Sequence, residues 1–428
     1  MKYYIIAGEA SGDLHGSNLM KGIYAEDPTA DIRFWGGDSM LSVWNSSQSL
    51  HSVPSQVSST LQDRATPLAA GGGAHEVGGV VLESTTNLTG NVGLVRHYKE
   101  GAVMGFIEVL MKARKLLKNV EFCKQDILSW NPDVVILIDY PGFNFKIAEF
   151  AHKAGFKVFY YIAPKVWASR EKRIEKLRKY VDKLFIVFPF EKPYFDSKGI
   201  EYIYKGNPLV DAVDGSAAMK ETRADFLKRN SLPESPVIAM LAGSRKPEIS
   251  TMMPVLTEFA AKMHVLPQYA DHQFIIAGAP ARNMDDYSAW LNEENSKYIK
   301  ILFGQTQSII RHAEAAVVNS GTASLETALF GTPQVVGYIM NPLTYKLARL
   351  IVKIKYISLG NLIVNKFAFK EFIQDDCNPD ALVKEIRALI EDTDYRQQML
   401  TDYAEIRTLL GGSGASAAVA KAMIEELK

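Results

Sequence analysis

Short apolar runs alternate with helical patterns over most of this sequence, and this alternation restricts the fold more than any other feature. A run such as Val134–Ile138 (VVILI) is hydrophobic at consecutive positions, as expected of a strand whose sheet is covered by helices on both faces. Helical patterns follow, for example at Leu14–Tyr24 and Lys146–Lys153. We therefore predict an α/β fold with parallel sheets. The predicted strands are Tyr3–Ala7, Asp133–Ile138, Lys157–Ile162, Leu184–Phe188, Glu201–Tyr204, Val237–Leu241, Phe274–Ala277, Ala315–Asn319 and Gln334–Gly337.

The predicted strands form two series that are separated near Gly206–Asp214. A chain of 428 residues is also longer than one hydrophobic core usually serves. We therefore expect two Rossmann-like domains, over residues 1–206 and 207–379, whose sheets face a cleft between the domains. Residues 380–428 have a helical pattern, and we expect them to pack back on the N-terminal domain.

Residues 44–91 do not fit the alternating pattern. They are rich in Ser, Thr, Gly and Ala, include Ser46–Ser49 and Gly71–Gly73, and carry little charge. A structureless run of this length is uncommon inside a compact domain. We expect a disordered surface insertion, with an ordered functional flap or an error in the sequence as the alternatives.

Composition excludes several classes of protein. The 48 Lys and Arg residues balance 48 Asp and Glu residues, which argues against a nucleic-acid partner. Two distant cysteines and eight histidines without paired spacing predict neither a disulfide nor a metal site, and we expect no cofactor. No apolar run reaches the roughly 18 residues of a membrane span, and the short apolar N-terminus does not resemble a signal peptide. We expect a cytoplasmic protein, either soluble or peripheral.

Polar residues follow two predicted strands of the first series. Ligands of open α/β sheets bind beyond the carboxyl ends of the strands. The run Gly8-Glu9-Ala10-Ser11-Gly12-Asp13 follows the first strand, and its small residues allow backbone N–H groups to approach a sugar or phosphate. A tight turn capped by Ser11 or Asp13 is an equal alternative. Asp139 follows the strand at residues 133–138, where its carboxylate can accept a proton from an attacking hydroxyl or simply cap the next helix.

Two strand ends of the second series carry a different chemistry. Gly243-Ser244-Arg245 combines backbone donors, a hydroxyl and a guanidinium, which suits a diphosphate. Ser320-Gly321-Thr322 begins a helix on which Glu326 follows, and a glutamate can bind both hydroxyls of a ribose. The structural alternatives are a glycine turn with a solvated arginine and a capping box. Asn361 offers one more polar contact or, beside Gly360, a turn.

Two stretches mix basic and apolar residues. Val103–Leu117 reads VMGFIEVLMKARKLL, and Tyr345–Lys355 reads YKLARLIVKIK. An amphipathic helix rimmed by Lys and Arg can lie in an anionic membrane surface or hold an acyl chain. The alternative is a helix packed on its own core. The residues of the first stretch predicted to contact lipid are Val103, Met104, Phe106, Ile107, Val109, Leu110, Lys112, Arg114 and Lys115.

Taken together, these motifs resemble the lipid-A-disaccharide synthase family. The resemblance runs in order along nearly the whole chain and fails between about Trp44 and Asn91. The family's Trp-Ala-Trp is Trp167-Ala168-Ser169 here. The motifs that carry the resemblance are Ala7–Asp13, Ala102–Leu110, Pro132–Asp139, Ala163–Ala168, Gly243–Arg245, Ser320–Ala323 with Glu326, and Tyr356–Leu362.

The resemblance implies a fold of the GT-B type and an inverting glycosyl transfer. The donor would be UDP-2,3-diacylglucosamine, the acceptor 2,3-diacylglucosamine 1-phosphate (lipid X), and the place of action the inner face of the cytoplasmic membrane. Asp139 becomes the candidate general base, and Glu9, Ser11, Gly12 and Asp13 line the acceptor side. The oligomeric state is left open, with a homodimer as one candidate. The residues implied in UDP binding are Gly243, Ser244, Arg245, Ser320, Gly321, Thr322, Glu326 and Asn361.

Two other classes remain as alternatives. Another GT-B enzyme acting on UDP-N-acetylglucosamine, either a 2-epimerase or a peptidoglycan glycosyltransferase, would not need the stretch from Val103 to Lys118. A UDP-sugar-binding protein disabled by the insertion would bind UDP without turnover.

Overall fold

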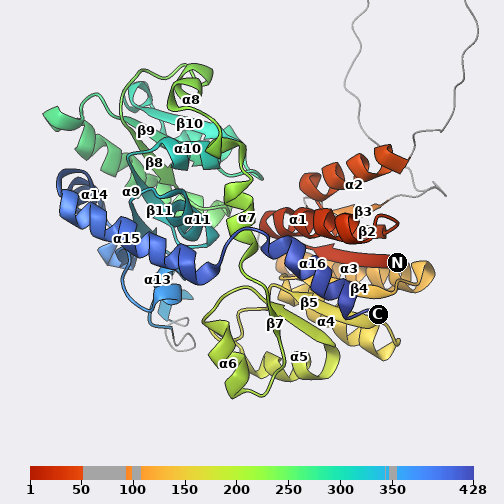
Figure 1. The fold of residues 1–428 in the computed structure, drawn as a ribbon. Helices are drawn as coiled ribbons and strands as arrows, with labels where there is room; N and C mark the ends of the chain where they lie inside the picture. The colour runs from red at the N-terminus through yellow and green to blue at the C-terminus, as the bar shows by residue number, and fades with distance from the viewer. Residues whose placement is uncertain (52–92, 99–107, 343, 347–353) are drawn as a thin grey trace, which may run out of the picture.

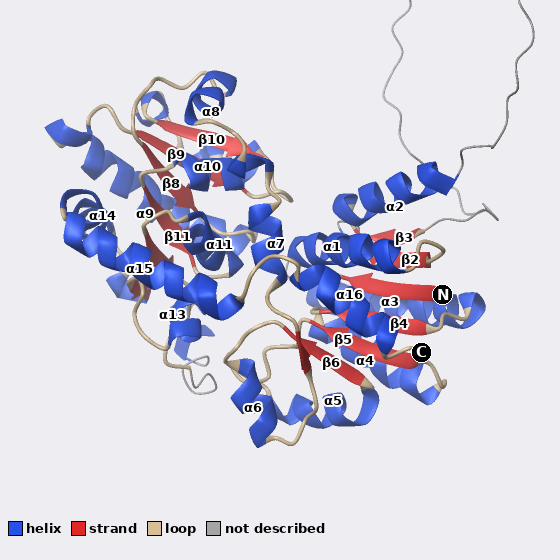
Figure 2. Cartoon of the chain, in the orientation of Figure 1, coloured by secondary structure: helices blue, strands red, loops and turns tan. Residues whose placement is uncertain are grey.

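The computed structural model describes residues 1–51, 93–98, 108–342, 344–346 and 354–428. The chain forms two α/β units side by side, each built on one parallel sheet with helices on both faces (Figures 1 and 2). The predicted fold class, two Rossmann-like domains, is therefore confirmed.

The first sheet has seven parallel strands in the order β3-β2-β1-β4-β5-β6-β7. Because β1 pairs with β2 on one side and with β4 on the other, the strand order reverses between β1 and β4. Ligands of such sheets bind at this reversal. The strands are β1 (Lys2–Ala7), β2 (Asp31–Gly36), β3 (Leu94–His97), β4 (Val134–Ile138), β5 (Lys157–Tyr161), β6 (Lys183–Ile186) and β7 (Ile203–Tyr204).

The second sheet repeats this arrangement with six parallel strands, β10-β9-β8-β11-β12-β13. Its order reverses between β8 and β11, which pair directly. Each sheet therefore offers one crevice at the carboxyl ends of its strands. The strands are β8 (Val237–Leu241), β9 (Gln273–Gly278), β10 (Ile299–Phe303), β11 (Ala315–Asn319), β12 (Gln334–Tyr338) and β13 (Glu371–Ile373).

Helices connect successive strands and cover both faces of each sheet (Figure 2). Those of the first unit are α1 (Ala10–Glu26), α2 (Asp38–His51), α3 (Glu108–Trp130), α4 (Pro141–Lys153), α5 (Ile174–Tyr180) and α6 (Glu191–Ser197). The main helices that follow are α7 (Pro208–Asp214), α8 (Arg223–Arg229), α9 (Lys246–His264), α10 (Thr306–His312), α11 (Thr322–Phe330), α13 (Leu359–Val364), α14 (Pro379–Glu391), α15 (Thr393–Leu410) and α16 (Ala415–Glu425). In the described part of the chain, no helix combines the length and apolar character that a membrane crossing requires.

Four strands were not predicted, namely β2, β3, β10 and β13. β3, β10 and β13 lack a long apolar run because their side chains are mostly only partly buried, as in the intermediate pattern of all four β3 residues. β2 is mostly buried, but Asp31 and Arg33 interrupt its apolar residues. β3, β10 and β13 lie at sheet edges, where one side of the strand has no neighbour. A half-covered strand mixes polar and apolar residues, so its sequence does not stand out.

The prediction of a structureless run beginning at Trp44 is wrong for its first eight residues. Residues 44–51 form the second half of α2. The ring of Trp44 fixes this part of the helix, because it fills the space beside Gly93. A Cβ on Gly93 would lie 2.1 Å from Nε1 of Trp44. The helix thus packs against the chain that enters β3. Residues 52–91 lie outside the described residues.

The C-terminal region forms three helices that divide between the two units. α14 and α15 pack with α9, α11 and α13 on the second unit, whereas α16 packs along α1 of the first (Figure 1). Gly22 permits this contact, since a Cβ there would lie 2.8 Å from Cβ of Ala420. Asp211 on α7 accepts hydrogen bonds from the N–H groups of Gly414 (2.5 Å) and Ser416 (2.7 Å). The chain therefore crosses between the units twice, and α7 joins the two crossings.

Candidate active site

Asp139 stands at the reversal of the first sheet on a backbone that is fixed from several sides. Its N–H donates to the carbonyl of Tyr161 (3.1 Å). Its carbonyl accepts from Nδ2 of the buried Asn144 (2.7 Å) and from the hydroxyl of Tyr160 (2.6 Å). Asp139 and Tyr140 both adopt left-handed backbone angles, with φ of 43° and 46°. Such conformations are unfavourable for non-glycine residues and cluster at ligand sites.

The pKa of Asp139 is raised, mainly because the carboxyl group is buried. The charge of Lys165 acts in the opposite direction, and that of Glu9 raises the pKa further. Arg245, from the second unit, also lowers the pKa. A carboxylate with a raised pKa accepts a proton more readily than an exposed one, so Asp139 has the environment of a general base.

Glu9 and Arg245 connect the two units across the cleft. Oε2 of Glu9, directly after β1, lies 3.6 Å from a guanidinium nitrogen of Arg245, directly before α9. Both side chains are more than half exposed, so this ion pair is weak. Its importance is geometric, because it brings the end of β1, which pairs with the strand that carries Asp139, opposite the start of α9.

The backbone at Gly243–Arg245 turns sharply and meets Glu248. Gly243 has a φ of 110°, and a Cβ there would lie 2.4 Å from Nδ2 of Asn319. Oε2 of Glu248 accepts from the N–H groups of Ser244 (3.0 Å) and Arg245 (3.2 Å). The predicted diphosphate donors are therefore occupied by a carboxylate in this conformation. A diphosphate bound there would have to displace Glu248.

The second predicted strand end lies directly beside this turn. Nδ2 of Asn319 donates to the carbonyl of Ala242 (3.2 Å), while the buried Oδ1 has no partner among the described residues. Ser320, Gly321 and the exposed Thr322 follow it at the start of α11. These residues, together with Arg245, surround the reversal of the second sheet.

Glu326 lies on the second turn of α11. Burial raises the pKa of its carboxyl group, and Nε2 of Gln307 donates to Oε1 (2.7 Å). Oε1 of Gln307 in turn accepts from the hydroxyl of Ser216 (2.5 Å). The carboxylate is thus held in place by α10 and is available as an acceptor for ligand hydroxyls.

Two predicted contact residues have their polar groups engaged within the protein. Asn361 is fully buried; Nδ2 donates to the carbonyl of Phe369 and to Glu371, and Oδ1 accepts from the N–H groups of Ala368 and Phe369. Asp13 is buried and accepts from the N–H groups of Gly37, Ser39 and Met40. Asn361 therefore has no capacity left for UDP, and Asp13 shapes the start of α2.

Ser11 and Gly12, which were also predicted for the acceptor side, lie on the first turn of α1. Ser11 is exposed. Gly12 is buried, and a Cβ added there would lie 3.3 Å from Cβ of Ala7. Of the predicted lipid contacts, Val103, Met104, Phe106 and Ile107 lie outside the described residues. Val109, Leu110, Lys112 and Arg114 lie on α3 in a part whose side chains are not described, and Lys115 is partly buried.

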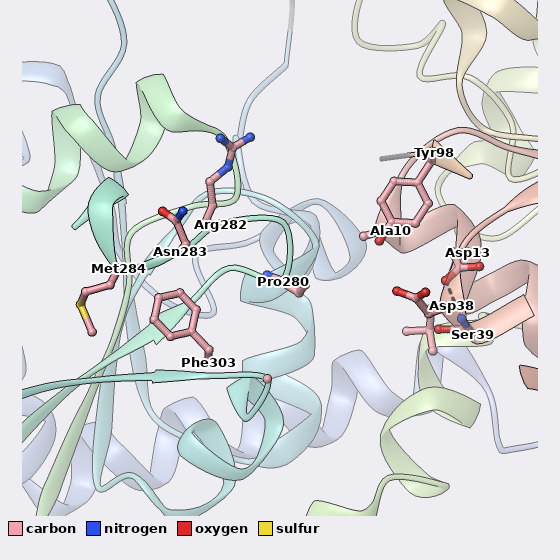
Figure 3. A pocket seen from close by; sticks show the side chains of 12 residues that line it. Ala10, Asp13, Asp38, Ser39, Tyr98, Pro280, Arg282, Asn283, Met284 and Phe303 are labelled. Atoms are coloured by element: carbon pink, nitrogen blue, oxygen red, sulfur yellow. Dashed lines mark hydrogen bonds between the residues drawn. The ribbon is translucent and has the colours of Figure 1, made fainter. Parts of the chain in front are cut away.

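A cavity of about 790 Å³ lies between the two units, beside the first turn of α1. Figure 3 shows Ala10, Asp13 and Tyr98 on one wall and Arg282 and Phe303 on the other. The second wall comes from the segments that follow β9 and β10. The sequence does not predict this wall, because Arg282 and Asn283 lie several residues beyond the end of β9 and because β10 is not apparent as a strand.

An aromatic cluster at the domain boundary was also missed. The ring of Trp167 lies 4.8 Å from that of Phe190, which stacks on Phe188 at 5.2 Å, and all three pack against the core of the second unit. Nε1 of Trp167 donates to the buried Glu191 (3.2 Å), whose pKa burial raises to about 7. The Ala163–Ala168 motif was the available signal, but nothing in it shows that Trp167 faces the other domain.

Comparison with known proteins agrees with this architecture. A family model described as lipid-A-disaccharide synthetase matches residues 75–423. The chain is 33% identical to a lipid-A-disaccharide synthase of Syntrophus aciditrophicus, over 96% of this chain and 94% of the relative. It is 30% identical to one from Coxiella burnetii, over 97% and 96%.

Solved structures share the fold at low identity. A UDP-GlcNAc 2-epimerase from Methanocaldococcus jannaschii, solved with UDP-GlcNAc and UDP, superposes with a TM-score of 0.61 at 13% identity and covers 99% of this chain and 100% of its own. A glycosyltransferase from Rickettsia africae gives 0.55 at 12%, over 100% and 98%. These likenesses show the GT-B architecture alone, whereas the family model and its relatives decide between the candidate families. This chain belongs to the lipid-A-disaccharide synthase family of glycosyltransferases.

Proposed function

We propose that this protein transfers 2,3-diacylglucosamine from UDP-2,3-diacylglucosamine to the 6-hydroxyl of 2,3-diacylglucosamine 1-phosphate, forming the β-1,6 disaccharide 1-phosphate and UDP. The names of its relatives support these substrates. The observation that carries the assignment of the site is the 3.6 Å contact of Glu9 with Arg245. This contact supports a site with the partly buried Asp139 on one side of the cleft and the start of α9 on the other.

Inversion at the anomeric carbon requires one in-line displacement. Asp139 takes the proton of the acceptor 6-hydroxyl while its oxygen bonds to C1 of the donor sugar. The bond from C1 to the diphosphate oxygen breaks, and its electron pair leaves with UDP. A positioned base contributes about 10²- to 10⁴-fold to such a step.

The donor side stabilises the departing UDP. Arg245 and the N–H groups at Ser320–Thr322 supply positive charge to the diphosphate, as guanidinium groups and helix starts do. Glu326, steadied by Gln307, binds the ribose hydroxyls. Glu248 occupies the N–H groups of Ser244 and Arg245, so UDP binding includes the rotation of this carboxylate away from the turn.

The acceptor side lies on the first unit. Glu9, Ser11 and Gly12 line it, and Asp13 contributes by holding the turn at Gly37–Met40. The apolar and basic stretch from Val103 to Lys115 would meet acyl chains and phosphates at the inner face of the cytoplasmic membrane. Peripheral binding there is part of the proposal.

UDP release by the purified protein tests this function. Release should require both acylated sugars and should be absent with either sugar alone. Release from the donor alone would indicate a hydrolase or an epimerase-like activity. A folded protein that binds UDP without releasing it from the pair of sugars would be a disabled homologue.

A further inference from the structure

Two arginines for which the described residues offer no acidic partner lie close together in the chain beyond β5. Arg170 directly precedes the short 3-10 turn Glu171–Arg173, and Arg173 ends it. Among the described residues, no carboxylate lies within 4.0 Å of either guanidinium. The acids nearby in sequence pair elsewhere, Glu171 with Lys198 (2.6 Å) and Glu175 with Arg178 (2.5 Å).

Arg173 lies beside the groups that hold Asp139. Its guanidinium carbon is 5.7 Å from the centre of the Phe145 ring, which lies 5.8 Å from that of Tyr160. The hydroxyl of Tyr160 donates to the carbonyl of Asp139. The positive charge of Arg173 also lowers the pKa of Tyr160 against the effect of its burial. Arg173 therefore lies near the backbone that holds Asp139, and Arg170 precedes it by three residues on the same turn.

The electrostatics of the pair favour an anion. Partial burial and the charge of Arg170 lower the pKa of Arg173, yet a guanidinium keeps its proton in proteins. The two cations are therefore close enough to affect each other, and the described residues supply no counter-ion to either. Arg170 also has a φ of 56°, a conformation that non-glycine residues rarely adopt and that recurs where ligands are clamped.

We propose that Arg170 and Arg173 bind the phosphate of the acceptor sugar. This inference rests on the proposed function, in which the acceptor carries its reacting hydroxyl at C6 and a phosphomonoester at C1. With the hydroxyl at Asp139, the phosphate points away from the donor and along the first unit. Guanidinium groups bind phosphate through two parallel hydrogen bonds, so the pair selects a phosphorylated acceptor.

Two variants and a matched control test this assignment. Arg170→Asn removes the guanidinium and suits a left-handed backbone, whereas Arg173→Gln keeps part of the stem that packs on Phe145. Lys172→Gln, on the same turn and exposed, is the control. UDP release is measured with 2,3-diacylglucosamine 1-phosphate and with the same sugar lacking its phosphate, in neutral detergent micelles.

For each arginine variant, kcat/KM with the phosphorylated acceptor should fall about tenfold or more, since a hydrogen bond to a charged group is lost. With the acceptor lacking phosphate it should stay near the wild-type value, as should KM for the donor. Equal losses with both acceptors would overturn the inference and indicate a structural role. If the variants keep the wild-type preference for the phosphorylated acceptor but no longer bind phosphatidylglycerol vesicles, the arginines bind a lipid headgroup and the inference is overturned.

A binding measurement separates this inference from the proposed function. Glucosamine 1-phosphate should bind the wild-type protein and the Lys172→Gln control in calorimetry, and bind at least tenfold more weakly to the arginine variants, while UDP affinity is retained. If both variants bind glucosamine 1-phosphate as tightly as the wild type, the proposed phosphate site is contradicted, even if glycosyl transfer is observed. Absence of transfer by the wild-type protein would instead contradict the proposed function.

Discussion

At the scale of single residues, the candidate base depends on charges from three separate segments. Lys165 and Arg245 lower the pKa of Asp139, whereas Glu9 and burial raise it. These residues are distant in sequence, so the sequence predicts Asp139 as a candidate without predicting its acidity. The position directly after an apolar strand was sufficient to find it, because parallel strands end at the same edge of the sheet.

The pH dependence of kcat/KM should report this environment. Asp139 is active only when it is deprotonated, so kcat/KM should fall as the pH drops through its raised pKa. Lys165→Gln removes a charge that lowers this pKa and should move the acid limb of the profile to higher pH. Glu9→Gln removes a charge that raises the pKa and should move the limb to lower pH.

The opposite directions of the two shifts form an internal control, since general damage to the site would not move the limb in two directions. Movement of both limbs in the same direction, or no movement, would contradict Asp139 as the titrating base.

At the scale of elements, the sequence predicts most interior strands and the edge strand β7, but not the edge strands β3, β10 and β13 or the interior strand β2, whose apolar run Arg33 interrupts. β1, β4, β8 and β11 have continuous apolar runs, and they are the strands next to the two reversals. Their ends therefore carried the candidate residues. The strand order itself cannot be read from apolar runs, so neither the contact of Glu9 with Arg245 nor the wall near Phe303 was predictable.

Gly8 shows how one element depends on another. A Cβ at Gly8 would lie 2.3 Å from Cδ1 of Tyr140, so Gly8→Ala forces the left-handed turn after β4 to move. We expect a loss of about 1–3 kcal/mol in the free energy of unfolding, together with reduced turnover. Gly142→Ala is the matched control, because nothing lies within 4 Å of its Cβ position. Denaturant unfolding measures the free energy of unfolding of both variants, and equal stability of the two would contradict the packing argument.

At the scale of the whole molecule, the two units are held together by α7, α16 and the chain crossings beside them. His15 on α1 is buried near Asp211 of α7, and its Nδ1 has no partner among the described residues. Burial lowers the pKa of His15 to about 4. Two domains were predictable from two series of strands, but the return of α16 to α1 depends on a complementary surface that helical periodicity does not show.

His15 should make the fold sensitive to mild acid. Because its pKa is lower in the folded than in the unfolded state, the stability it contributes is complete above pH 6.5 and is lost as the pH falls towards 4. Between pH 7 and pH 5 the free energy of unfolding should drop by about 2 kcal/mol more in the wild type than in His15→Gln. The exposed His152→Gln should behave as the wild type. An identical pH dependence in His15→Gln would contradict a neutral, buried His15.

The measurement that tests the central claim most directly is the turnover of Asp139→Asn beside its affinity for UDP. If Asp139 is the general base of a glycosyl transfer in the cleft, turnover should fall at least about a hundredfold while UDP binds as in the wild type. Asp196→Asn, an exposed change on α6, should retain full turnover. Near-normal turnover of Asp139→Asn would contradict the claim, and joint loss of turnover and UDP binding would make Asp139 a structural residue.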